Sequence, residues 1–321
     1  MSLIINSKDI TFAVQGPIVT NDSQTRHCLS SVRKYYPESQ IILSTWKGSQ
    51  IDDLDYDEVI LSDDPGAKHI YFKNYINNLN RMIVSTKAGI LKSNTKYTVK
   101  IRTDMIVLNS NLLHLLLNIE KPYNGLFNSR IIIPSNWSKN PDRHEKMLFH
   151  PSDFLYAGLT KDLKDLFSIP LMSENDMTWF KKNKIPSNAA IPSFIPRYAN
   201  EQYVMIAYLN KKKFDHSLNH VFDYSKKAHE THNKFFFENL LLKHAKNIGV
   251  NSQKYPYKWS TNCNEAYTEL EVLNLGNKIK KIDCERMYYN FLTIFKFILK
   301  FLERITIGFT KKKILRLNKT K

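Results

Sequence analysis

Short apolar runs alternate with helical patterns along the first hundred residues. Runs rich in β-branched and aromatic residues predict strands at 10–14, 41–44, 59–61 and 97–101. Leu29, Val32 and Tyr36 recur at helical spacing, and a second helical pattern covers 74–93. Short strands that alternate with helices form sheets that are covered on both faces. The pattern therefore predicts an α/β fold with a Rossmann-type, mostly parallel sheet and flanking helices.

The pattern loosens after Ser110. Apolar helices are expected over 112–119, from 200 to 209, and over 234–246. The stretch 134–197 contains seven prolines, which suits irregular loops around a few short elements. We expect one domain over 1–276, with halves at 1–110 and 111–276, and a separate tail over 277–321.

Composition indicates a folded globular chain. Of 321 residues, 42% are hydrophobic and 24% are charged, which excludes a disordered, collagenous or coiled-coil chain as a whole. The three cysteines, Cys28, Cys263 and Cys284, have neither disulfide-framework nor zinc-site spacing. The first residues carry no basic and apolar export pattern. We therefore expect the protein to stay in the cytoplasm.

The net charge of +17 is concentrated in the tail. Between Lys278 and Lys321 there are thirteen Lys or Arg against three acidic residues, and bulky apolar residues lie between them. This pattern predicts an amphipathic helix on an anionic membrane surface. Charges at 296, 300, 303 and 304 would lie near the middle of a membrane span, which disfavours one. A helix packed back onto the domain is the alternative. No nucleic-acid partner is expected, because the main body lacks a nucleic-acid-binding motif.

Unusual residues follow each predicted strand, at the edge where parallel sheets bind ligands. They are Gln15-Gly16-Pro17, Thr45-Trp46, Asp63-Asp64-Pro65 and Arg102-Thr103-Asp104. The glycine-rich dinucleotide motif, the phosphate-binding loop and the hydrolase nucleophile elbow are absent. What remains is a nucleotide-binding sheet whose fourth strand ends in a carboxylate, as a sugar-nucleotide transferase requires. Each of these segments is also a good turn sequence, which is the structural alternative.

The amino-acid sequences of these segments are more specific than their positions at strand ends. Five of them occur in order: ITFAVQGP (10–17), SVRKYYP (31–37), ILSTW (42–46), SDDPG (62–66) and KIRTD (100–104). Together with Asn80-Arg81-Met82-Ile83 and Asn200-Glu201-Gln202-Tyr203, this succession resembles the WavE family of lipopolysaccharide-core and capsule synthesis proteins, over about residues 10–210. The resemblance implies a GT-A-like glycosyltransferase that moves a sugar from a nucleotide-sugar donor to a lipid-linked or glycan acceptor, at the inner face of a bacterial inner membrane. It makes 1–110 the nucleotide-sugar half and 111–276 the acceptor half.

Candidate site residues follow from the strand ends and from the resemblance. For the donor we expect contacts from Gln15, Gly16, Pro17, Thr45, Asp64, Arg81, Lys100, Arg102 and Asp104. In inverting GT-A enzymes a carboxylate at a helix start removes the acceptor proton. The resemblance therefore makes Glu201 the candidate base, with Asp153 as the second choice. Of the histidines, 216, 220, 229 and 232 are expected at the surface or in loops.

A divalent metal, Mg²⁺ or Mn²⁺, is the expected cofactor. GT-A enzymes usually present Asp-x-Asp, whereas this chain has Arg102-Thr103-Asp104, so that only Asp104 could be a ligand. In the alternative, Arg102 with Lys100 or Arg81 replaces the metal as the positive clamp on the donor phosphates. We favour the metal.

Two other functions stay open. A sugar nucleotidyltransferase would need a lysine-rich loop after the first strand, and residues 15–19 contain no lysine. A basic adaptor that binds membranes or RNA would show neither donor hydrolysis nor stabilisation by a nucleotide sugar.

Overall fold

The protein was analysed as a computed structural model that describes residues 6–70, 75–119, 125–187, 189–191, 193–255 and 265–277. The chain divides into two units, Met1–Val272 and Leu273–Lys321. The predicted tail helix lies outside the described residues, and the division at 276 stays a prediction. No helix in the described ranges combines the length and the apolar character that crossing a membrane requires.

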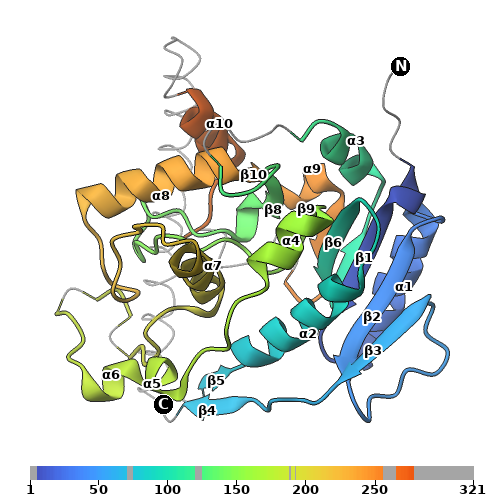
Figure 1. Cartoon of the computed structure of the whole chain (residues 1–321), viewed down its shortest axis with the longest axis horizontal. Coiled ribbons are helices and arrows are strands. Elements are labelled where there is room, and N and C mark those ends of the chain that lie inside the picture. The colour runs from blue at the N-terminus through green and yellow to red at the C-terminus, as the bar shows by residue number, and fades with distance from the viewer. Residues whose placement is uncertain are drawn as a thin grey trace, which may run out of the picture. The chain divides into compact units, whose positions relative to one another are not determined.

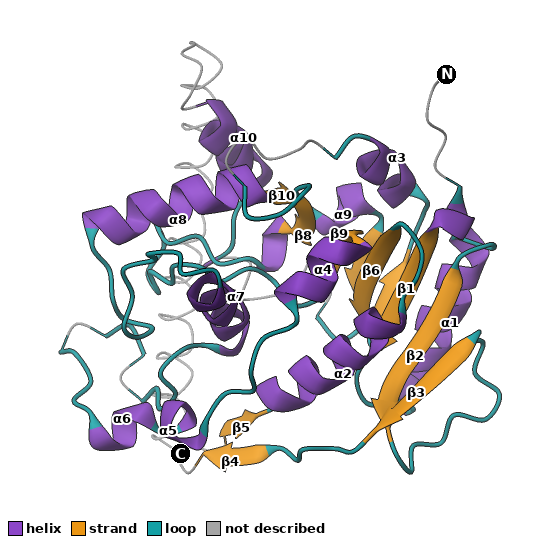
Figure 2. Ribbon diagram, viewed as in Figure 1, coloured by secondary structure: helices purple, strands orange, loops and turns teal. Residues whose placement is uncertain are grey.

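A seven-stranded sheet forms the centre of the first unit (Figures 1 and 2). Its order is β10-β8-β9-β6-β1-β2-β3. Neighbours pair in parallel except for β9, which is antiparallel to both β6 and β8. The strands are β1 (Ile10–Gln15), β2 (Gln40–Trp46), β3 (Glu58–Ser62), β6 (Tyr97–Arg102), β8 (Ile131–Pro134), β9 (Leu155–Leu159) and β10 (Leu240–Lys243). The prediction of a mostly parallel α/β sheet is confirmed.

Helices cover both faces of this sheet. The longer helices of the described residues are α1 (Gln24–Tyr35), α2 (Leu79–Lys92), α3 (Asn111–Leu117), α4 (Thr160–Leu166), α7 (Asn200–Lys211), α8 (Lys226–Asn239) and α10 (Glu269–Asn277), and the short ones are α5 (Glu174–Met177), α6 (Trp179–Lys182) and α9 (Ala245–Ile248). Two small antiparallel sheets pair β4 (Lys68–Ile70) with β5 (Tyr75–Asn77) and β7 (Met105–Val107) with β11 (Val250–Ser252). Single turns of 3-10 helix occur at Ser7–Asp9, Asn21–Ser23 and Ser135–Trp137.

Successive side chains of a strand point to opposite faces of the sheet, so the residues of β1 and β6 can each be assigned to one face. Phe12 and Val14 of β1 pack with Leu29 of α1 in the main core. Ala13 points to the opposite face, where α2 approaches so closely that a Cβ atom at Gly89 would lie 3.3 Å from the Ala13 Cβ. Helices α2, α4 and α7 contact one another on that second face. Lys100 and Arg102 of β6 also belong to it, because Val99 and Ile101 lie in the α1-side core.

Two predicted elements differ from the structure. The helix predicted over 74–93 begins at Leu79, because residues 75–77 form β5. The helix predicted over 234–246 is wrong in its second half: α8 ends at Asn239, and Leu240–Lys243 form a strand parallel to β8. An apolar run of this length fits a helix or a buried strand equally well, and pairing with β8 decides between them.

Candidate active site

Two basic residues of β6 lie next to a cavity near the carboxyl end of that strand. Lys100 is fully buried, and its Nζ donates to the backbone carbonyl of Asp153. Burial lowers the pKa of Lys100 to about 8, although the neighbouring Asp153 carboxylate opposes this shift. The Nζ lies 5.7 Å from the centre of the Tyr156 ring, so an aromatic face also accommodates this charge.

Arg102 is the centre of an ion-pair network. Its Nε and one terminal nitrogen donate to the two carboxylate oxygens of Asp104 at 2.9 and 2.6 Å, in a fork-to-fork pair. The other terminal nitrogen lies 3.5 Å from an Asp153 oxygen, and the guanidinium stacks 4.5 Å from the centre of the Phe154 ring. Burial lowers the pKa of Arg102, but Asp153 and Asp104 outweigh it and raise the pKa overall. Arg102 is thus a permanent, rigidly held positive charge.

Two carboxyl groups with opposed titration lie beside these cations. Glu201 occupies the first turn of α7, which begins at Asn200. Burial, together with the Asp153 charge, raises the pKa of Glu201 to about 7. For Asp153, burial is outweighed by Arg102 and Lys100, and its pKa is lowered. Near neutral pH the pair therefore holds one carboxylate that stays ionised and one that can take up a proton.

A cavity of about 440 Å³ opens between these groups. Its lining combines charged and polar side chains with three aromatic ones, Trp137, Phe154 and Tyr255, which we call the aromatic wall. The rings of Trp137 and Phe154 lie 4.5 Å apart, and Tyr255, which is 41% exposed, stands edge-on to Phe154. The lining residues are Arg102, Trp137, Lys139, Glu145, Met147, His150, Ser152, Asp153, Phe154, Ala199, Asn200, Glu201 and Tyr255.

The structure thus brings Lys100, Arg102 and Asp104 together with Asp153 and Glu201, which sequence spacing alone could only suggest. Arg102, Asp153 and Glu201 line the cavity. Lys100 and Asp104 lie behind that wall as partners of the lining residues.

The turn after β1 is held by internal hydrogen bonds. Gln15 is buried and accepts from the Ser85 hydroxyl at 2.7 Å, while the Thr103 hydroxyl donates to the Pro17 carbonyl at 2.7 Å. Gly16 has φ +126°, a conformation that favours glycine, and a Cβ there would lie 3.1 Å from the Thr103 hydroxyl oxygen. Thr45 is also fully buried. Donor contact by these four predicted residues stays a prediction, because their observed partners are internal.

Asp64 and Arg81 form a separate pair at the ends of β3 and α2. Arg81 binds both Asp64 oxygens, at 2.8 and 2.6 Å, and its guanidinium lies 5.4 Å from the centre of the Trp46 ring. Burial would raise the pKa of Asp64, but the Arg81 fork and the Gly66 amide lower it overall. Neither residue lines the cavity, so the two predicted donor contacts form a group of their own.

Sequence reasoning missed several lining residues, above all His150 and the aromatic wall. His150 is 7% exposed, and its Nε2 lies 3.4 Å from a Glu201 oxygen. The expectation that the other histidines lie at the surface or in loops is wrong for His232, which is fully buried in α8, whereas His216 lies in a loop but is only 7% exposed. Both rings bind backbone amides, His232 that of Phe149 and His216 that of Leu218, so that they hold loops. The proline-rich composition around His150 marks a loop but does not say which side chain enters the site.

The residues around Asp104 do not fit a resident metal. Both of its carboxylate oxygens accept hydrogen bonds from Arg102, and the guanidinium charge lies where a cation would. Within the described ranges, no group of three or more His, Cys, Asp or Glu side chains could hold an ion. The side chains around Asp104 therefore favour the alternative in which Arg102 replaces the metal as the positive clamp on the donor phosphates. Metal dependence itself stays a prediction.

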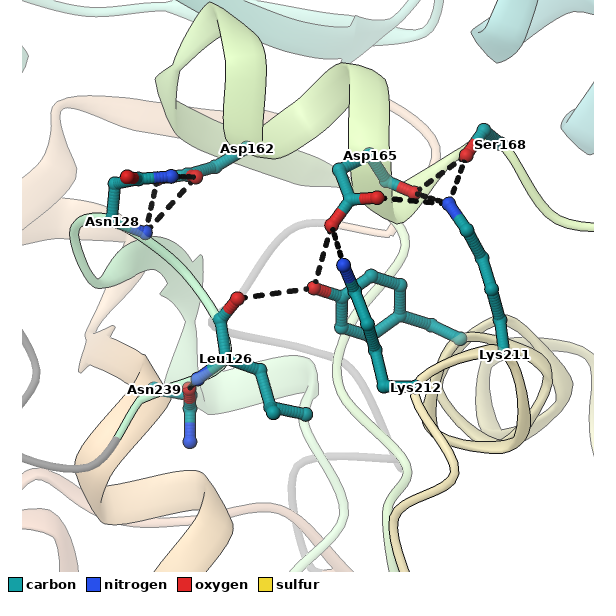
Figure 3. Close-up of polar contacts among 9 residues, drawn as sticks. Leu126, Asn128, Asp162, Asp165, Ser168, Lys211, Lys212 and Asn239 are labelled. Atoms are coloured by element: carbon teal, nitrogen blue, oxygen red, sulfur yellow. Dashed lines mark hydrogen bonds and ion pairs between the residues drawn. The ribbon is translucent and has the colours of Figure 1, made fainter.

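Helix α7, which carries Glu201 at its first turn, is anchored at its other end (Figure 3). The Asp165 carboxylate of α4 binds Lys211 at 2.8 Å and Lys212 at 2.6 Å, and it accepts from the Tyr208 hydroxyl at 3.0 Å. Burial would raise the pKa of Asp165, but these hydrogen bonds lower it, so the carboxylate stays ionised. The anchor thereby ties the C-terminal end of α7 to α4.

Comparison with known proteins agrees with the resemblance noted above. The family model described as WavE lipopolysaccharide synthesis matches residues 10–310. A search of the curated proteins gives no match. The match covers nearly the whole chain, including every cavity residue named here. We conclude that the chain belongs to the WavE lipopolysaccharide synthesis family and has a role in lipopolysaccharide synthesis.

Proposed function

We propose that the protein is a glycosyltransferase that moves a sugar from a nucleotide-sugar donor to a growing lipopolysaccharide-core or capsular glycan. The observation that carries the proposal is the cluster of Arg102, Lys100, Asp153 and Glu201 at the carboxyl end of β6, on a cavity of about 440 Å³. Parallel sheets bind ligands at this edge. The family match supports the same reaction class.

Glu201 is proposed as the general base. A base is most effective when its pKa lies near the working pH, and burial together with Asp153 raises the pKa of Glu201 to about 7. On deprotonating the acceptor hydroxyl, Glu201 would leave an oxygen that attacks the anomeric carbon of the donor. The bond from that carbon to the diphosphate then breaks, with inversion at the carbon.

Arg102 is proposed to stabilise the departing diphosphate. Its guanidinium is fixed by Asp104 and by stacking on Phe154, so it need not reorganise as negative charge develops. Lys100 contributes a second positive charge behind it. Asp153, held ionised by both cations, would keep their orientation and maintain the high pKa of Glu201.

The aromatic wall suits a sugar ring. Phe154, which stacks on Arg102, and Tyr255 contribute aromatic surface to the cavity lining, and Tyr255 is 41% exposed. Sites of this composition bind ligands through apolar faces and orient them with a few polar groups. We assign this wall to the acceptor sugar, because its residues come from 137–255 rather than from β1 to β3. Trp46 at the end of β2, Asp64 after β3 and Arg81 in the first turn of α2 are proposed to contact the nucleoside.

A panel of UDP-, GDP-, CMP- and TDP-linked sugars tests the proposal. The matching donor should raise the melting temperature, and the donor at a hundred times its Kd would stabilise the fold by about 2.7 kcal/mol. Glu201→Gln should keep this shift and lose transfer by at least about a hundredfold, the usual contribution of a general base. Glu174→Gln is the matched control, since Glu174 also lies in a first helical turn but is exposed.

The outcomes separate the alternatives. Near-normal turnover by Glu201→Gln would remove Glu201 as the base and leave Asp153 as the candidate. Release of pyrophosphate with formation of a nucleotide sugar would indicate a nucleotidyltransferase. Stabilisation by none of the four donor classes would favour the basic adaptor.

The location at the inner face of the inner membrane is part of the proposal. Its support is the charge of the sequence after Lys278, where basic and apolar residues alternate. Removal of 286–321 should release the protein from anionic liposomes and leave donor stabilisation unchanged. Sedimentation of the truncated chain with those liposomes, or its unfolding, would contradict membrane attachment through the tail.

A further inference from the structure

His150 lies against the proposed base, in the loop between the 3-10 turn Ser135–Trp137 and β9. Its ring is 7% exposed and lines the cavity, and its Nε2 lies 3.4 Å from an oxygen of Glu201. The loop carbonyl of His150 itself accepts from the Lys139 amide at 3.0 Å. The imidazole is therefore held within reach of the Glu201 carboxylate.

The protonation state of the His150 ring determines whether its Nε2 can donate a hydrogen bond to Glu201. Burial and the Lys139 charge lower the pKa of His150 to about 3, so the ring is neutral near pH 7 and carries one proton. Its Nδ1 is buried without a hydrogen-bond partner among the described residues. Its Nε2 faces a carboxylate, which only accepts. The tautomer with the proton on Nε2, donating toward Glu201, is therefore favoured.

The backbone that aims His150 is strained. Phe149 has φ +54°, a left-handed conformation that costs a non-glycine residue about 1–3 kcal/mol. Its amide donates to Nδ1 of the buried His232 at 2.9 Å, and Nε2 of His232 lies 2.8 Å from the Tyr267 hydroxyl. The Phe149 ring packs edge-on to His232 at 5.2 Å. Buried partners thus maintain a turn that an aromatic residue does not adopt readily.

A second brace ties the same loop to the helix that carries the base. Gln202, next to Glu201 and fully buried, donates from Nε2 to the Leu148 carbonyl at 2.8 Å. This hydrogen bond connects the loop that carries His150 to the first turn of α7, which carries Glu201. The hydrogen bond from the Phe149 amide connects the same loop to His232 of α8.

We propose that His150 is a positioning residue that holds one Glu201 oxygen and stabilises the ionised carboxylate. The inference rests on the proposed role of Glu201 as the base. The charged groups that act on Glu201 are Asp153, which opposes ionisation, and Arg102, Lys139 and Lys100, which favour it. His150 adds a neutral donor at a defined distance, which these charges do not supply.

The test uses the full chain with His150→Phe and His150→Gln. In His150→Phe, kcat at pH 7 should fall about tenfold, the size of one hydrogen bond to a charged group. The acidic limb of the kcat profile should move to higher pH by about one unit, since the ionised carboxylate loses a donor. The donor KM and the donor-induced rise in melting temperature should not change. His150→Gln supplies an amide donor and should recover most of the rate and of the original profile.

His216→Phe is the matched control. His216 is an equally buried histidine outside the cavity, and its ring binds Asn210 and the Leu218 amide. It should lower the melting temperature without moving the pH profile. A wild-type profile in His150→Phe, or equal profiles in His150→Phe and His150→Gln, would overturn the positioning role. Normal transfer by Glu201→Gln would instead remove Glu201 as the base, and the inference would fall with that role. If His150→Phe does not fold, His150→Gln and the control decide.

Discussion

Replacement of Arg102 by methionine removes the cation on which the site is built. The variant keeps an unbranched apolar side chain but removes the guanidinium. It leaves Asp104 and Asp153, whose side chains are 8% and 14% exposed, with Lys100 as their remaining close cation. Loss of one partner of a buried pair costs about 3–5 kcal/mol. Because the Arg102 side chain is itself 24% exposed, we expect about 3 kcal/mol, the lower end.

At about 2 °C per kcal/mol for a chain of this size, Arg102→Met should lower the melting temperature by roughly 6 °C. The double variant Arg102→Met/Asp104→Asn removes the orphaned carboxylate as well. It should recover about 2 kcal/mol, or roughly 4 °C, relative to the single variant. Transfer should fall about 10²- to 10³-fold in both variants, because neither offers the fixed positive charge to the leaving diphosphate.

Thermal unfolding and initial transfer rates are measured on the same four proteins of the cycle: wild type, Arg102→Met, Asp104→Asn and the double variant. Equal stability of the single Arg102→Met and the double variant would show that Asp104 does not depend on Arg102. Recovery of transfer in the double variant would refute the catalytic role of Arg102 and leave the pair a purely structural one.

Three further predictions concern the metal, pH and the acceptor. Transfer should persist in EDTA, since Asp104 is engaged by Arg102; loss of activity that Mg²⁺ or Mn²⁺ restores would reinstate the metal. The kcat should rise as pH increases through about 7, because Glu201, whose pKa burial raises, acts only when deprotonated; a flat profile from pH 6 to 8 contradicts this role. Tyr255→Ala should raise the acceptor KM about tenfold and leave donor hydrolysis unchanged, whereas Tyr255→Phe keeps the ring; a higher donor KM would instead assign the ring to the donor.

Four strands of the sheet were predictable because their sequences alternate clearly with helices. Runs such as 10–14 and 97–101 are β-branched and bounded by turn residues, so local chemistry suffices to identify them. The strand Leu240–Lys243 was not predictable, since its Leu-rich sequence is stabilised by pairing with Ile131 and its neighbours, which are distant along the chain. The antiparallel position of β9 between β6 and β8 likewise depends on contacts between segments that are distant along the chain.

Residues of the candidate site were predictable where a charged side chain follows a predicted strand or lies at the start of a predicted helix. Arg102 is the last residue of β6, Asp104 follows two residues later, and Glu201 lies in the first turn of α7. The local sequence therefore predicted all three positions. It did not predict His150, because its place beside Glu201 depends on the strained turn at Phe149 and on the buried ring of His232. Contacts of this kind exist only after the chain has folded.

Because α7 is held at its C-terminal end by Asp165, a small tilt of the helix there displaces Glu201 at its other end. Ten residues separate Glu201 from Lys211, which is about 15 Å of helix. A tilt of about 4° at the Lys211 end therefore displaces the carboxylate by about 1 Å, and misplacement of that size can cost a hundredfold in rate. Substitutions at Asp165 or Lys212, remote from the cavity, are consequently places where evolution or laboratory selection can retune the geometry of the base without altering any residue that lines the cavity.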